Sequence, residues 1–113
     1  MLSFCLDIAN GMDFLTRECG IIHRDLKSLN VLMFSTPSFP RCKICDFGLS
    51  REGSTTMQVT FAGSVCWTPP EFLKAHTVSH KTDVYSFGIV AWEIITRCMP
   101  YNGMMHICVR HIM

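Results

Sequence analysis

The segment from Asp83 to Thr96 restricts the fold of this chain more than any other feature. Its side chains are apolar almost all round, and a helix without a polar face must be buried on all sides. The apolar positions are Val84, Tyr85, Phe87, Ile89, Val90, Ala91, Trp92, Ile94 and Ile95. A chain of 113 residues has hardly enough protein to surround such a helix. We therefore expect the chain to be part of a larger domain.

The composition supports this expectation and excludes several classes of protein. The chain is 49% hydrophobic and 17% charged, whereas soluble domains average roughly 25% charged residues. Its net charge of +1 and its scattered basic residues indicate no nucleic-acid surface. The apolar run is far shorter than the roughly 20 residues of a membrane span, and it contains Glu93. The N-terminal stretch "MLSFCLDIAN" lacks the basic start of a secretory signal. We expect a cytoplasmic protein.

The seven cysteines indicate neither disulfides nor a zinc site. "CKIC" at 42–45 is the only CxxC pair, and no second pair completes a metal site. The pair falls in an expected strand, where positions three apart face opposite sides. Without a secretory context we expect reduced thiols.

Periodicity predicts a mainly α fold with one short β-hairpin. Apolar residues at helical spacing predict a helix over 2–19, with Gly20 as its C-cap. "VLMF" (31–34) and "RCKIC" (41–45) read as two strands separated by a Pro- and Ser-rich turn. Residues 46–70 read as a long loop, and such loops are usually functional or disordered.

The loop "IIHRDLKSLNVL" (21–32) places strongly polar groups between aliphatic pairs that anchor it to a core. Phosphoryl transfer requires a carboxylate to orient the attacking hydroxyl, cations near the phosphates and oxygen ligands for Mg²⁺. The loop supplies Asp25, Lys27 and Asn30, and Asp46 follows the second strand. The hairpin would bring Asn30 and Asp46 together, so the sequence predicts a phosphoryl-transfer site.

Four motifs in this order resemble those of eukaryotic protein kinases. His23 to Asn30 is similar to the catalytic loop, and Asp46-Phe47-Gly48 is similar to the magnesium-binding DFG motif. "WTPPE" (67–71) resembles the end of the activation segment, and 83–101 resembles the central helix of the large lobe. The resemblance covers essentially residues 1–113. It implies a partial kinase domain, a C-terminal lobe that begins before the catalytic loop and ends just after the central helix.

The resemblance implies roles for the polar residues, with ATP and Mg²⁺ as cofactors and a protein as substrate. Asp25 would be the catalytic base or hydroxyl-orienting group, and Lys27 would neutralise charge on the transferred phosphate. Asn30 and Asp46 would hold Mg²⁺. As an alternative, the two aspartates would cap turns and Lys27 would be solvated.

Other positions resemble structural and regulatory residues of the family. His23 and Phe47 would stack in a hydrophobic spine, and Gly48 completes the DFG motif. Leu32, Val90 and Ile94 are similar to spine positions beneath the adenine, although a plain core role fits them equally well. Asp83 would bind the backbone of the catalytic loop, although a helix N-cap would look the same. Glu71 would pair with an arginine of a later helix that residues 1–113 do not contain.

Arg24 suggests control by phosphorylation of the long loop, because an arginine there can pair with a phosphate. The candidate acceptors are Ser54, Thr55, Thr56 and Thr60. Lys27 after "HRDL" and Ser64 in the substrate loop resemble the pattern of serine/threonine-specific enzymes. "DFGLSR", Trp67 and "DVYSFG" resemble tyrosine kinases, and this mixture is typical of the tyrosine-kinase-like group.

Several motifs of the family are missing from the 113 residues. Nothing matches the glycine-rich loop, the small-lobe lysine, its helix glutamate or the adenine-binding hinge, and Thr68-Pro69 replaces the usual Met-Ala pair. Because positioning supplies nearly all of this catalysis, we expect the isolated chain to be inactive. Three interpretations remain: a piece of an active kinase that phosphorylates proteins with ATP, a non-catalytic binding or decoy module, or an unstable gene fragment. In the first, the small lobe would come from upstream coding sequence or from a partner chain.

Overall fold

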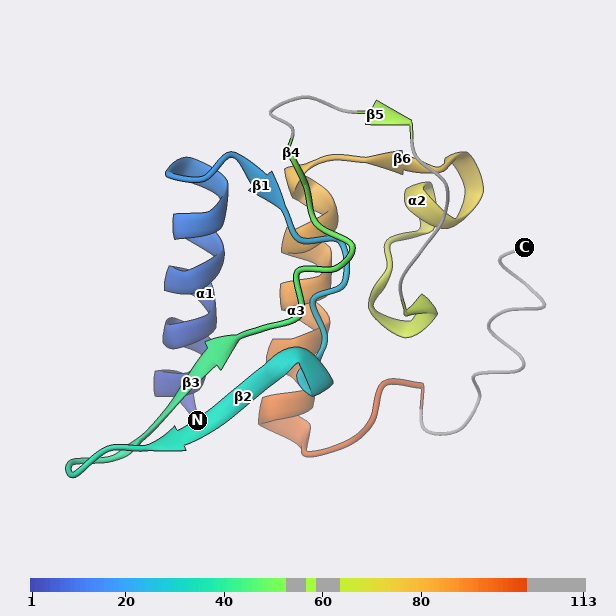
Figure 1. Ribbon diagram of the computed structural model, residues 1–113. Coiled ribbons are helices and arrows are strands. Elements are labelled where there is room, and N and C mark those ends of the chain that lie inside the picture. Colours follow the sequence, from blue (N-terminus) through green and yellow to red (C-terminus); the bar gives the residue numbers. More distant parts are fainter. Residues whose placement is uncertain (53–56, 59–63, 102–113) are drawn as a thin grey trace.

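The computed structural model describes residues 1–52, 57–58 and 64–101, and three helices dominate it (Figure 1). These helices are α1 (Leu2–Arg17), α2 (Pro70–Ala75) and α3 (His80–Thr96). The strands are β1 (Ile21–Ile22), β2 (Val31–Ser35), β3 (Pro40–Ile44), β4 (Arg51–Glu52), β5 (Met57–Gln58) and β6 (Thr77–Val78). Two short 3₁₀ turns, η1 (Ser28–Asn30) and η2 (Val65–Trp67), complete the elements. The predicted fold class, mainly α with a short hairpin, is confirmed.

Helix α1 lies beside α3 in Figure 1 and forms one wall of the core. It ends at Arg17 with Glu18 as its C-cap, so the predicted C-cap at Gly20 was wrong by two residues. Gly20 instead takes the left-handed conformation, with φ 65°, that turns the chain into β1. The buried face is centred on Ile8 and Met12, because β3 and α3 pack there.

The β2–β3 hairpin forms as predicted and lies across the lower ends of α1 and α3 in Figure 1. Its antiparallel register pairs Val31 with Ile44. An ion pair fastens it to α1, because Arg41 donates to both carboxylate oxygens of Asp7 over 2.7–2.9 Å. The same carboxylate accepts the backbone N–H of Cys42 at 3.2 Å. The hairpin is therefore held in a fixed position relative to the core.

Helix α3 begins at His80, three residues before the predicted start. Ser79 is its N-cap and forms a capping box with Thr82. The described part of the chain does not surround α3, because Val84 is 67% and Ile95 63% exposed. This agrees with the expectation that 113 residues are too few to bury the helix on all sides. No described element covers that face. Among the described residues, no helix is long and apolar enough to cross a membrane.

The fully buried residues of α3 are one apolar side chain and several polar ones, and Phe87, Ile89 and Ile94 pack partly buried against the same core. Val90 is 1% exposed and belongs to the main core cluster. The other buried residues of the helix are Thr82, Asp83, Ser86 and Glu93. Three of these polar side chains bind segments far away in sequence, as described below. The inward face therefore fastens loops as well as filling the core.

The expected long loop over 46–70 contains short elements that its sequence did not indicate. Strand β4 pairs with β1, and β5 pairs with β6, each over two residues. Turn η2 carries Cys66 and Trp67 into the core, and α2 starts at Pro70 with Pro69 as its N-cap. Proline suits a first helical position because its missing N–H would have no helical partner.

Candidate active site

The catalytic-loop segment between β1 and β2 is anchored by one apolar side chain and one carboxylate. Leu26 is fully buried in the main core cluster. Asp83 accepts the backbone N–H groups of His23 at 2.7 Å and Arg24 at 2.9 Å. Burial raises the pKa of Asp83, and these two hydrogen bonds oppose that shift. Since Ser79 caps α3, the Asp83 carboxylate serves the loop and is not the N-cap.

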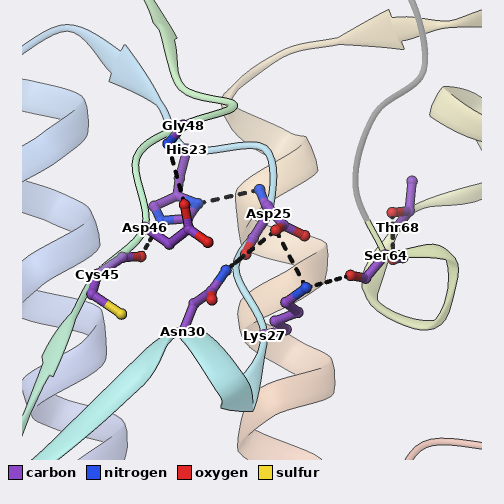
Figure 2. Close-up of polar contacts among 9 residues, drawn as sticks. All are labelled: His23, Asp25, Lys27, Asn30, Cys45, Asp46, Gly48, Ser64 and Thr68. Atoms are coloured by element: carbon purple, nitrogen blue, oxygen red, sulfur yellow. Dashed lines mark hydrogen bonds and ion pairs between the residues drawn. The ribbon is translucent and has the colours of Figure 1, made fainter.

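His23 links the two halves of the site through its ring. Its Nδ1 accepts the backbone N–H of Asp25 at 3.2 Å, and its Nε2 lies 3.0 Å from the carbonyl oxygen of Cys45 (Figure 2). Both contacts are satisfied by the neutral tautomer with the proton on Nε2. The Phe47 ring packs against it with centroids 5.3 Å apart. The predicted neighbours His23 and Phe47 are thus in contact.

The structure brings Asp25, Lys27 and Asn30 together (Figure 2). Lys27 Nζ lies 3.4 Å from Asp25 Oδ2. Asn30 Nδ2 donates to the backbone oxygen of Asp25 at 2.7 Å and to Oδ2 at 3.3 Å. These bonds immobilise the carboxylate from one side. Its other oxygen, Oδ1, is buried without a hydrogen-bond partner among the described residues.

Asp46 lies at the end of β3, beside Asn30 as the hairpin predicted. The backbone oxygen of Asn30 accepts the N–H of Cys45 at 2.9 Å, which joins the start of β2 to the end of β3. Asp46 has a positive φ of 62° and accepts the Gly48 N–H at 3.4 Å. Its exposed carboxylate and the Asn30 amide oxygen are the hard oxygen donors that suit Mg²⁺.

The segment 64–68 packs against the loop through Lys27. Lys27 Nζ donates to Ser64 Oγ at 2.7 Å. Thr68 Oγ1 donates to the backbone oxygen of Ser64 at 2.8 Å and closes this turn. Pro69 is fully buried. The unusual Thr68-Pro69 pair is therefore accommodated, and the Thr68 hydroxyl makes a bond that methionine could not.

Arg24 is 5% exposed and is turned away from Asp25. It donates to the backbone oxygen of Leu49 at 3.2 Å and lies 5.7 Å from the centroid of the Phe72 ring. Burial lowers the pKa of Arg24, and the nearby positive charge of Arg51 adds to that effect. The predicted phosphate acceptors Ser54, Thr55, Thr56 and Thr60 lie outside the described residues.

Two other predicted positions are exposed in this chain. Glu71 lies in the first turn of α2 on the surface, and no ion pair joins it to a described residue. Leu32 is 56% exposed, whereas Val90, proposed for the same spine, is buried. Of the described residues, no group of three or more His, Cys, Asp and Glu side chains is placed to hold a metal.

Sequence reasoning missed a buried carboxylate behind the site. Glu93 accepts the hydroxyl of Ser28 at 2.8 Å and the indole N–H of Trp67 at 2.7 Å. Ser86 Oγ donates to the backbone oxygen of Trp67 at 2.7 Å. No local pattern pointed to this cluster, because its members come from three distant segments. The one signal was an acidic residue inside an otherwise apolar helix.

Comparison with known proteins agrees with this geometry. The family model for protein tyrosine and serine/threonine kinases matches residues 1–113. The chain is 41% identical over 110 residues to human mitogen-activated protein kinase kinase kinase 11, covering 91% of this chain and 13% of the relative. It is 46% identical over 110 residues to the probable serine/threonine-protein kinase drkC of Dictyostelium discoideum, covering 92% and 14%.

A third relative, the mitogen-activated protein kinase kinase kinase of Drosophila melanogaster, is 41% identical over 110 residues, which is 91% of this chain and 10% of that protein. The chain thus spans only 10–14% of the length of these three relatives. The family match, the described motifs and their arrangement in space agree. This chain belongs to the protein tyrosine and serine/threonine kinase family.

Proposed function

We propose that this chain is the phosphoryl-transfer portion of a protein kinase that phosphorylates serine or threonine in protein substrates, with ATP and Mg²⁺. The main support for the proposal is the difference between the two oxygens of the Asp25 carboxylate in their contacts. Oδ2 lies close to Lys27 and Asn30, while Oδ1 is buried without a partner among the described residues. A buried unpaired carboxylate oxygen is unfavourable in a purely structural loop. It suits a group that accepts the hydroxyl of a substrate.

Each polar residue of the site has a separate role in the proposed reaction. Asp25 Oδ1 orients the substrate hydroxyl and accepts its proton as the hydroxyl oxygen bonds to the γ-phosphorus and ADP leaves. Lys27, held by Asp25 and Ser64, stabilises the negative charge on the transferred group. Asn30 and Asp46 supply the oxygen ligands of the metal. When bound, Mg²⁺ would neutralise charge on the phosphate oxygens.

The contact between Lys27 and Ser64 supports serine and threonine, rather than tyrosine, as the residues that are phosphorylated. Lys27 Nζ reaches across the site to Ser64 Oγ and thereby sets the distance between the catalytic loop and the segment 64–68. We propose that this spacing suits the short side chain of serine or threonine better than the longer side chain of tyrosine. Two Dictyostelium discoideum relatives of this chain are named as probable serine/threonine-protein kinases, which agrees with this proposal.

We also propose that residues 1–113 alone transfer no phosphate, because they contain none of the small-lobe groups that hold ATP. The partner is then a protein segment that supplies the small lobe. The test replaces the matching segment of human mitogen-activated protein kinase kinase kinase 11 with this chain, so that the relative supplies the remaining parts. The assay measures ATP-dependent phosphorylation of a Ser/Thr protein substrate, with Asp25→Asn as the matched variant.

The expected result is transfer by the chimaera and a loss of at least about a hundredfold with Asp25→Asn. Transfer that is equal in both forms would refute the role of Asp25. A chimaera that melts cooperatively, binds Mg-ATP and transfers nothing would favour a non-catalytic binding module. Turnover by residues 1–113 alone, lost on substitution of Asp25, would refute the proposal that the isolated chain is inactive.

Phosphorylation of the long loop is the proposed means of control. Arg24 and Arg51 lie close enough for their charges to interact, and neighbouring cations attract a phosphate. The acceptors would be Ser54, Thr55, Thr56 or Thr60. Mass-spectrometric mapping of an active chimaera tests this proposal. Full activity with all four hydroxyls unmodified would contradict it.

A further inference from the structure

Five residues form a closed ring of contacts that joins the catalytic loop to the segment 64–68. Glu93 on α3 binds Ser28 with one oxygen and Trp67 with the other. Ser28 follows Lys27 in the chain, and Lys27 binds Ser64 at 2.7 Å. The ring is closed by a backbone hydrogen bond, in which the N–H of Trp67 donates to the carbonyl oxygen of Ser64 at 3.1 Å. Every link of this ring is a hydrogen bond of the structure or a peptide bond.

The Glu93 carboxylate is unusual for a residue of its charge. It is 8% exposed, and the indole N–H that it accepts belongs to Trp67, which is 7% exposed. Burying a charge is unfavourable unless hydrogen bonds compensate. Here the two bonds go to two different segments, 65 and 26 residues away in sequence. A carboxylate placed in this way forms a direct polar bridge between the two segments, in addition to the Lys27–Ser64 bond and the shared core that holds Leu26 and Trp67.

We infer that Glu93 is a positioning residue that sets the distance between Lys27 and Ser64 by holding Ser28 and Trp67 at once. This inference rests on the proposed function for its catalytic meaning, because Lys27 and Ser64 face the proposed substrate. Loss of Glu93 frees both segments and opens the Lys27–Ser64 contact. Glutamine retains the bridge, since its amide oxygen accepts from Trp67 and its amide nitrogen donates to the Ser28 hydroxyl, which can also accept.

The experiment measures the contact directly and does not require activity. Purified residues 1–113 are labelled briefly with acetic anhydride, and mass spectrometry gives the rate at Lys27 relative to the exposed Lys43 and Lys81. The Lys27 side chain is 19% exposed in the intact contact. Wild type, Glu93→Ala, Glu93→Gln and Ser28→Ala are compared. Trp92→Phe is the matched control. It changes the other tryptophan of the chain, which lies next to Glu93 in sequence but on the exposed side of α3.

The expected result is that Glu93→Ala raises the relative labelling rate of Lys27 by about tenfold, a ratio that corresponds to about 1.4 kcal/mol. Ser28→Ala gives a smaller rise, and Glu93→Gln and Trp92→Phe leave the rate within about twofold of wild type. The indole N–H resonance of Trp67 in ¹H–¹⁵N spectra should shift in Glu93→Ala and stay near its position in Glu93→Gln. Glutamine keeps the shape and the hydrogen-bonding groups of glutamate without its charge, so rescue by Glu93→Gln shows that the charge is not required. The Trp67 resonance and the Ser28→Ala variant report on the two hydrogen bonds themselves, which a role in packing alone would not affect.

Unchanged labelling of Lys27 in a Glu93→Ala protein that still melts cooperatively would overturn the inference. If Glu93→Ala does not fold, the Ser28→Ala variant takes its place in the test. An unchanged labelling rate of Lys27 in Ser28→Ala then overturns the inference. A rise in Glu93→Gln equal to that in Glu93→Ala would also contradict the bridge. The labelling result is independent of the chimaera assay. Failure of phosphate transfer with a positive labelling result would therefore refute the proposed function and leave the bridge intact.

Discussion

Two leucines in the same loop provide a matched test of what holds the catalytic loop in place. Leu26 is fully buried, and Leu29, three residues later, is 73% exposed. Both lie between Asp25 and the start of β2, and both have the same side chain. Leu26→Ala and Leu29→Ala therefore remove the same atoms from opposite environments.

The structure predicts very different effects on the free energy of unfolding. Each substitution removes three carbons, and burial of each is worth about 0.8 kcal/mol, so Leu26→Ala loses about 2.4 kcal/mol of transfer energy. The cavity among Ile8, Trp67 and Val90 adds to this loss, and a total of about 3 kcal/mol falls within the usual range for core leucines. Leu29→Ala should change stability by less than about 0.5 kcal/mol.

Urea unfolding followed by far-ultraviolet circular dichroism measures both variants. With a slope of about 1.5 kcal/mol per molar urea, Leu26→Ala lowers the midpoint by about 2 M, and Leu29→Ala leaves it nearly unchanged. Wild type must first show a cooperative transition, which also tests whether residues 1–113 fold alone. Equal midpoint shifts in the two variants, or a larger shift in Leu29→Ala, would refute the argument that Leu26 anchors the loop.

Two further predictions concern contacts that position the site. The hydrogen bonds from Arg41 lower the pKa of Asp7 below its ordinary value of 3.8, so this pair stabilises the fold above pH 3.8 and the contribution is lost as the pH falls through the lower folded pKa. Melting temperatures between pH 2 and 5 should therefore show an acid-dependent loss that Asp7→Asn removes, and identical pH profiles for both proteins would contradict the assignment. Thr68→Val removes the 2.8 Å bond to the Ser64 oxygen with little change of shape, and we expect a loss of about 1 kcal/mol in urea unfolding. Thr77→Val, which removes a longer bond of 3.3 Å to the backbone oxygen of Ala75 at a less buried position, is the comparison and should lose less. An equal loss in the two variants would refute this role for Thr68.

Much of the site could be predicted because its residues are close in sequence or joined by a hairpin. Asp25, Lys27 and Asn30 occupy one short loop, so any fold that anchors its ends brings them together. The Pro- and Ser-rich turn between two strands predicted that Asn30 and Asp46 would be neighbours. The register of β2 and β3 and the bond from the Cys45 N–H to the Asn30 oxygen place the two residues at the same end of the hairpin. Local spacing and turn chemistry were sufficient for these parts.

The prediction was least accurate where structure depends on distant partners. Strands of two residues, such as β1 and β4, have no pattern of their own and exist through pairing across the fold. The limits of α1 and α3 were wrong by two to three residues, because Glu18 and Ser79 form the caps in place of the expected residues. Short-range signals do not include these contacts.

Periodicity, turn residues and motif order are local properties, so they were enough to predict two long helices, a hairpin and a loop that resembles the kinase catalytic loop. Which face of α3 lies inward depends on the fold and could not be predicted in this way. Hydrophobicity did not distinguish the faces, because the helix is apolar almost all round. The exposed side includes Val84 and Ile95, whereas the buried side carries Val90 together with Asp83, Ser86 and Glu93. A polar side chain can be buried when donors converge on it. For Asp83 and Glu93 these donors lie 26 to 65 residues away and meet only in the folded chain.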